Sequence, residues 1–165
     1  MRRSEAAAAA AAVAALLAGC AATYVPPPGV AAVPLTVTRG QSPALLSHGA
    51  SFVAFGDAQC RSRLGSLGVV NLVSPEGKTS RVPAGTPVFL RAHSEGQEFG
   101  GPLRWRCVNV ARLELEPGYR YEVQQHFSQG RCSLSASRAA EDAASAAPRP
   151  WPLVVVPVAG ACKPA

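Results

Sequence analysis

Hydrophobic and polar residues alternate in short runs from residue 35 onward, and most of the runs end at glycine or proline. The clearest run is at residues 119–124, where two tyrosines and a valine alternate with arginine, glutamate and glutamine. A period of two is typical of a β-strand with one buried face and one face in water. We predict strands at residues 35–38, 50–55, 69–73, 86–93, 103–110, 113–115, 119–124, 132–136 and 153–158.

Regularly spaced short strands with turn signals between them are typical of a sandwich or a small barrel. We therefore predict an all-β fold, a small antiparallel β-sandwich stapled by disulfides, over residues 35–165. The continuously apolar run at residues 153–158 predicts a buried strand. Residues 59–68, rich in glycine and serine, are predicted to form a loop.

One stretch favours a helix. Residues 137–147 read SRAAEDAASAA, and alanine is the strongest helix former. Pro148 and Pro150 would end such a helix. Because the stretch has no apolar face beyond alanine, we predict a surface excursion at residues 137–150, helical or frayed, between two strands.

The start of the chain has the parts of a secretory signal: Arg2 and Arg3, an alanine-rich run at residues 6–15, and small residues before Cys20. The apolar stretch is shorter than the roughly 20 residues that span a bilayer. The sequence Leu-Ala-Gly-Cys at residues 17–20 resembles a bacterial lipobox. That resemblance implies that residues 1–19 are removed and that Cys20 becomes the lipidated first residue of the mature protein.

The residue after the cysteine bears on the destination. In the Gram-negative lipoproteins that this signal resembles, aspartate at this position tends to retain the protein in the inner membrane. Ala21 therefore implies delivery to the outer membrane, facing the periplasm. The alternative is an ordinary signal peptide cut near Gly19, with Cys20 an incidental thiol.

The cysteine count bears on these alternatives. The chain has five cysteines, and lipidation of Cys20 leaves an even set of four for disulfides in an oxidising compartment. Three pairings are open. We favour Cys107 with Cys132, which flank strands predicted to be neighbours, and Cys60 with Cys162, which would pin the C-terminal tail.

Residues 20–34 follow the signal and contain Pro26, Pro27, Pro28 and Gly29. Consecutive prolines favour an extended polyproline conformation. We predict a lipidated cysteine and a proline-rich linker that holds the folded domain off the membrane.

The charge does not indicate a nucleic-acid partner. Removing Arg2, Arg3 and Glu5 with the signal lowers the net charge from +6 to +5, and no run of five like charges occurs. The expected partners are the membrane, through the N-terminal lipid, and an envelope protein.

The segment at residues 82–134 contains VPAGTPVFL, then Cys107, then LELEPGYRYEV and GRCSL. It resembles a recurring pattern in small bacterial envelope lipoproteins of unassigned function. The resemblance implies a β-sandwich and no activity.

The chain carries no recognisable catalytic or cofactor motif. Residues 65–68 read GSLG, which is not the GxSxG of a nucleophile elbow. Ser51, His48 and Asp57 are the residue types of a catalytic triad, but any chain of this length contains such a combination, so we do not predict a triad. His93 and His126 could approach each other across a sheet but lack further metal ligands nearby. We predict no enzyme activity, no cofactor and no metal site.

Two tryptophans complete the candidates. Trp105 between two arginines is predicted to be a core residue of an alternating strand, with a ligand platform as the alternative. Trp151 between two prolines is predicted to cover one end of the sandwich or to contact a partner.

The sequence therefore predicts a non-enzymatic, lipid-anchored envelope lipoprotein with a binding or accessory role in the periplasm or at the outer membrane. The alternative is a periplasmic inhibitor of a host or rival enzyme, acting through an exposed loop. The candidate loops for that role are residues 94–102 and 139–150. A hydrolase is the third hypothesis.

Overall fold

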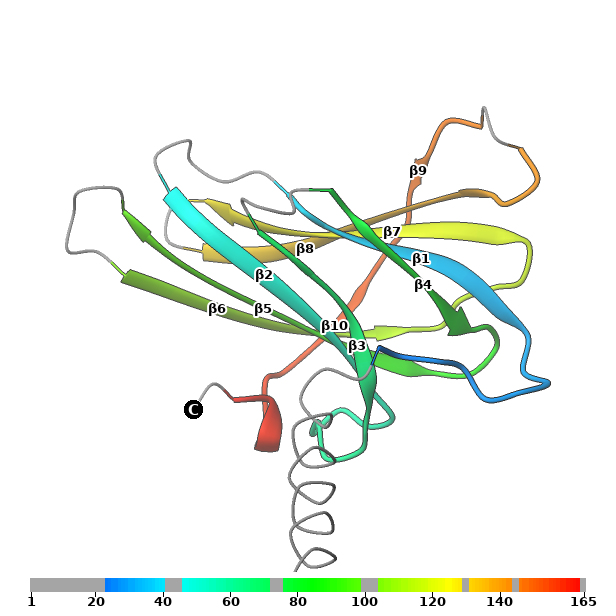
Figure 1. The fold of residues 1–165 in the computed structure, drawn as a ribbon, viewed down its shortest axis with the longest axis horizontal. Coiled ribbons are helices and arrows are strands. Elements are labelled where there is room, and N and C mark those ends of the chain that lie inside the picture. The colour runs from blue at the N-terminus through cyan, green and yellow to red at the C-terminus, as the bar shows by residue number, and fades with distance from the viewer. Residues whose placement is uncertain are drawn as a thin grey trace, which may run out of the picture.

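The protein is a β-sandwich in a computed structural model that describes residues 23–40, 46–71, 76–98, 104–128, 131–143 and 146–163 (Figure 1). Within these residues, ten strands form two five-stranded sheets. Each sheet contributes its apolar face to one shared core. The all-β sandwich predicted from the alternation is confirmed.

The first sheet, here the β7 sheet, has the strand order β4-β1-β7-β8-β9. In this sheet β1 and β7 run parallel, and all other neighbouring strands run antiparallel. Its strands are β1 (Ala32–Arg39), β4 (Lys78–Pro83), β7 (Tyr119–Ser128), β8 (Arg131–Ala140) and β9 (Arg149–Pro150).

The second sheet, here the β5 sheet, has the order β10-β6-β5-β2-β3 and is antiparallel throughout. Its strands are β2 (Leu46–Phe55), β3 (Arg63–Val70), β5 (Val88–Glu98), β6 (Arg104–Leu113) and β10 (Val154–Val156). A short 3-10 helix, η2 (Gly160–Cys162), follows β10.

Alternation along the strands builds the core. Leu35 and Val123 of the β7 sheet and Phe52 and Leu90 of the β5 sheet have no exposed surface. Each such side chain contributes about 1.5–3 kcal/mol by leaving water. Tyr121 is also buried, and its hydroxyl accepts a 2.9 Å hydrogen bond from the backbone N–H of Glu116, so the phenol is not left without a partner.

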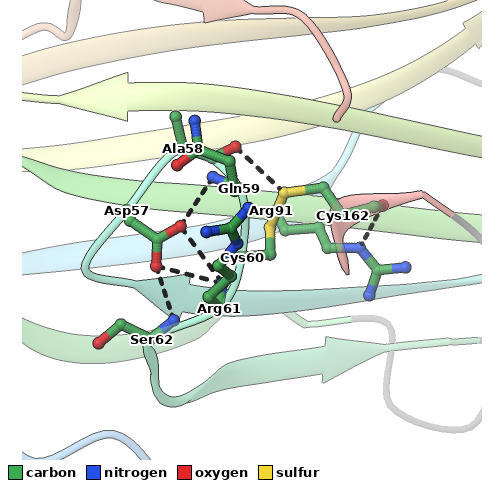
Figure 2. The surroundings of a disulfide bond; sticks show 8 residues. All are labelled: Asp57, Ala58, Gln59, Cys60, Arg61, Ser62, Arg91 and Cys162. Carbon is green, nitrogen blue, oxygen red and sulfur yellow. Dashed lines mark hydrogen bonds between the residues drawn. A yellow bond between two sulfur atoms is a disulfide. The ribbon is translucent and has the colours of Figure 1, made fainter. Parts of the chain in front are cut away.

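Both disulfides join the pairs that the sequence favoured. Cys60 bonds Cys162, with a Cα–Cα distance of 5.1 Å, and pins η2 to the loop between β2 and β3 (Figure 2). Cys107 bonds Cys132 at 5.9 Å. We had predicted that the strands of Cys107 and Cys132 are neighbours, and this prediction is wrong. They lie in different sheets, so the bond crosses the sandwich.

The excursion predicted at residues 137–150, helical or frayed, is shorter than expected: residues 137–140 continue β8, residues 149–150 form β9, and residues 141–143 and 146–148 contain no helix. Pairing with β7 extends to Tyr119 opposite Ala140. The Arg120 guanidinium then donates to the carbonyls of Ala140, Ala143 and Ala146 at 2.9, 2.9 and 3.2 Å. Tertiary partners thus override the helix propensity of alanine.

The predicted linker at residues 20–34 is wrong from residue 23 onward. Thr23 forms a parallel bridge with Ser66, and the Tyr24 N–H donates to the Ser66 carbonyl at 2.8 Å. The Tyr24 side chain is 6% exposed and belongs to the core, and β1 already begins at Ala32. The proline-rich residues form a surface loop between two segments of the fold.

Residues 59–68 were predicted as a loop, yet β3 begins at Arg63. The glycines of β3 do not form a turn. They let neighbouring segments of the chain pack closely against the strand. A Cβ on Gly65 would lie 2.7 Å from the Tyr24 Cα, and a Cβ on Gly68 would lie 2.5 Å from that of Lys78. Only glycine lets these backbones approach so closely.

Three further differences concern strands. Residues 153–158 were predicted to be a buried strand, but β10 is a short edge strand whose Val154 and Val155 are 60% and 54% exposed. The polar edge strand β4 was missed. Of the predicted inhibitor loop at residues 94–102, residues 94–98 lie in β5 and residues 99–102 lie outside the described residues.

Candidate functional site

The outer face of the β5 sheet carries a hollow of about 770 Å³, on the side away from the core. We call it the outer hollow. It lies over the middle and one end of β2, β5 and β6, and alternation turns several polar side chains toward it. Its walls are formed by Gly49, Ala50, Ser51, Val69, Asn71, His93, Glu95, Gly96, Gln97, Arg104, Trp105 and Arg106.

Strand register brings the polar groups of the hollow together. His93 and Glu95 are two residues apart on β5 and therefore point the same way. Ser51 on β2 is opposite His93, and Arg106 on β6 is opposite Glu95. The Arg106 guanidinium lies 3.8 Å from the Glu95 carboxylate, and both side chains are about half exposed. Such a pair adds about 0–1 kcal/mol to stability.

His93 is the group in the hollow with unused hydrogen-bonding capacity. Its Nε2 is buried and has no hydrogen-bond partner among the described residues. Burial lowers the pKa of His93, the positive charges of Arg91 and Arg106 lower it further, and Glu95 opposes them. The imidazole is therefore neutral at neutral pH, with one ring nitrogen as a donor and the other as an acceptor.

The balance of charge in the hollow is positive. Two guanidinium groups, of Arg104 and Arg106, stand with one carboxylate, of Glu95. Guanidinium groups bind carboxylates and phosphates through paired hydrogen bonds. The hollow therefore has the chemistry to bind a ligand that carries an anionic group.

The hollow does not contain an activated nucleophile. The Ser51 hydroxyl donates to the backbone carbonyl of His93 at 3.4 Å and not to its ring. Asp57 lies beyond the end of β2, where its carboxylate accepts bonds from the backbone N–H groups of Gln59, Arg61 and Ser62 at 2.8, 3.1 and 2.6 Å. The third residue of the Ser51, His48 and Asp57 triple is His48, and its side chain is not among those that the structure describes.

The two described histidines are far apart in the fold. His93 lies on the outer face of the β5 sheet, whereas the His126 Nε2 is 2.7 Å from the Ser135 hydroxyl on the outer face of the β7 sheet. The approach across one sheet that the sequence left open for these two histidines therefore does not occur. Among the described residues, no three His, Cys, Asp or Glu side chains gather as a metal site.

The chain matches no protein-family model, no curated protein and no solved structure. Its own residues therefore carry the functional argument.

Two further candidate residues from the sequence are Cys20 and Trp151. Cys20 lies outside the described residues, which begin at Thr23. The Trp151 ring contacts the Tyr121 ring edge-on at 4.9 Å, and the backbone N–H of Trp151 donates to the Ala136 carbonyl at 2.9 Å. It covers the core, the first of the two predicted roles, and a partner contact through its exposed part stays a prediction.

Trp105 is half-buried and lies between the sheets. Its ring stacks on Phe127 of β7 with centroids 3.9 Å apart, beside the Cys107–Cys132 bond. Part of it also borders the outer hollow. Sequence reasoning missed the hollow itself. The alternation of His93, Glu95 and Gln97 indicates one polar strand face. Which residues of the neighbouring strands lie beside that face depends on strand pairing and register, which the alternation does not give.

In the described part of the chain, no helix has the length and apolar character needed to cross a bilayer.

Proposed function

We propose that this protein is a non-enzymatic lipoprotein of the bacterial cell envelope, anchored by an acyl-modified Cys20 and binding a ligand in its outer hollow. The observation that carries the proposal is the use of the cysteines. Of five, four pair with each other as two disulfides, and the fifth is the cysteine of the lipobox-like sequence. Disulfides persist in oxidising compartments such as the periplasm, which supports export of the chain.

The anchor gives the protein its place. Each buried methylene of an acyl chain contributes about 0.8 kcal/mol, so one chain holds weakly and several hold durably. A triacylated Cys20 keeps the domain on the membrane without a transmembrane helix. Ala21 after the cysteine supports the outer membrane, facing the periplasm, as its location.

The binding role rests on the outer hollow. Arg104 and Arg106 supply positive charge, and the neutral His93 supplies a directed hydrogen bond. We propose that the ligand is an envelope component with an exposed carboxylate or phosphate group.

The anchor is tested by Cys20→Ser in the producing cell. Wild-type protein is expected to incorporate labelled palmitate and to stay in the membrane fraction after high-salt washing, whereas the variant carries no label and leaves that fraction. A variant that stays bound after washing contradicts the anchor.

The hollow is tested by capture from envelope extracts. Reversing its charge with Arg104→Glu and Arg106→Glu is expected to reduce recovery of the ligand at least tenfold. The matched control is Arg131→Glu, an exposed arginine at the start of β8 in the other sheet. Equal recovery by all three proteins contradicts binding in the hollow.

A further inference from the structure

The folded domain begins very close to the proposed lipid anchor. Thr23 pairs with Ser66 of β3, and Tyr24 is buried in the core. Cys20 precedes Thr23 by three residues. A fully extended chain covers at most about 3.6 Å per residue, so an acylated Cys20 lies within about 11 Å of Thr23. That distance is too short for a tether that lifts the domain off a bilayer.

The surface beside this attachment point is basic. We call it the basic corner, formed by the loop between β2 and β3, the start of β3 and the residue after η2. Arg61 follows Cys60 and Lys163 follows Cys162, so the disulfide joins the two segments that carry these cations. Figure 2 shows the bond and Arg61. The exposed cationic and large apolar side chains of the corner are those of Arg61, Arg63, Leu64 and Lys163.

The acidic residues nearby offset only part of this charge. Asp57 is the carboxylate of the loop, and three backbone N–H groups of the same loop surround it. The turns on the far side of this end carry further carboxylates, of which Asp142 is exposed. Glu114, Glu116 and Glu141 there are ion-paired with Arg112, Arg138 and Arg81, respectively.

We propose that the basic corner rests on anionic lipid headgroups of the membrane that holds Cys20. This inference rests on the proposed anchor and adds an orientation to it. The acyl chains supply the affinity, and Arg61, Arg63 and Lys163 select which face of the domain meets the bilayer. Leu64, which is 41% exposed, lies at the headgroup boundary.

The orientation has a direct consequence for the outer hollow. The corner lies where β2 ends, at Phe55 opposite Arg63. The hollow lies toward the other end of the same strand, around Gly49 and Ser51. A domain that rests on its basic corner therefore turns the hollow toward the aqueous phase, where a ligand reaches it.

The test uses the full-length protein purified in its acylated form and placed in vesicles of phosphatidylethanolamine and phosphatidylglycerol with a nitroxide on some headgroups. Leu64→Trp reports on the corner. Ser133→Trp, an exposed position on β8 at the opposite end, is the matched control. We expect the tryptophan at position 64 to be quenched several-fold more than the one at position 133. Adding Arg61→Gln and Arg63→Gln is expected to remove most of the difference.

Equal quenching at both positions in acylated, vesicle-bound protein overturns the inference and leaves the anchor standing. A difference that persists unchanged in phosphatidylcholine vesicles, or after the arginine substitutions, overturns recognition of anionic lipid. If mass spectrometry finds no acyl chain on Cys20, the proposed anchor fails and this orientation fails with it. Intact disulfides and an unchanged circular dichroism spectrum verify the fold of each variant.

Discussion

The two disulfides do different work in the same small domain. Cys107–Cys132 crosses the main core and joins strands of opposite sheets, with a sequence separation of only 25. Cys60–Cys162 joins a surface loop to the C-terminal segment across 102 residues. It anchors a second apolar cluster, in which Phe55 and Val110 pack under the tail. The first bond joins sheets that already share a core, and the second fastens the C-terminal segment, where Cys162 is fully buried and its carbonyl accepts a hydrogen bond from Arg91.

The largest effect is expected from removing the long-range bond. Replacing Cys60 and Cys162 with alanine frees a closed loop of 102 residues, for which chain entropy predicts a loss of about 4.7 kcal/mol in the free energy of unfolding. Urea unfolding followed by circular dichroism measures the loss. We also expect faster amide hydrogen exchange at residues 158–162, because the Ala161 N–H bond to the Gln59 carbonyl loses its support.

Removing the crossing bond is expected to cost less. Alanine at Cys107 and Cys132 opens a loop of 25 residues, which corresponds to about 3.5 kcal/mol. The same urea titration ranks the two double variants. A larger loss here than for the Cys60–Cys162 pair would show that the sheets depend on the bond between them more than on their shared core.

The smallest effect is expected from Asp57→Asn, which weakens the loop that presents Cys60. Hydrogen bonds from the backbone of Ser62, Arg61 and Gln59, with the charge of Arg61, lower the pKa of Asp57. A lowered pKa in the folded state contributes stability above the ordinary carboxyl value of about 3.9, and this is lost as pH falls through the lowered pKa. Wild-type protein should lose stability over that acidic range, and the variant should lose less of it. Parallel pH profiles of the urea midpoint for both proteins contradict this role.

The sequence predicted the features that depend on local pattern and on counting. Period-two alternation, as at Tyr119, Tyr121 and Val123, identified the strands because one face of each is buried. The cysteine count indicated two disulfides, and the place of Cys162 in the C-terminal tail favoured its pairing with Cys60.

The features that the sequence did not predict depend on tertiary contacts. Gly65 and Gly68 are typical of a turn, and only the approach of Tyr24 and Lys78 shows why a strand uses them. The alanines after Ser137 favour a helix until β7 supplies a pairing partner. The outer hollow needs three strands in register to bring His93, Glu95 and Arg106 together, and alternation alone does not give that register.

The parallel pairing of β1 with β7 sets when the domain can close as the chain emerges in the proposed export. Leu35 of β1 pairs with Tyr121 of β7, so β1 cannot pair with β7 until well over half of the chain has emerged. The last cysteine, Cys162, must also emerge before the loop at Cys60 is secured. Such long-range pairing slows folding and leaves strand edges exposed in the meantime. On the proposed route of export, the domain therefore stays open until Cys162 has emerged, and we expect folding to depend on periplasmic chaperones during that interval.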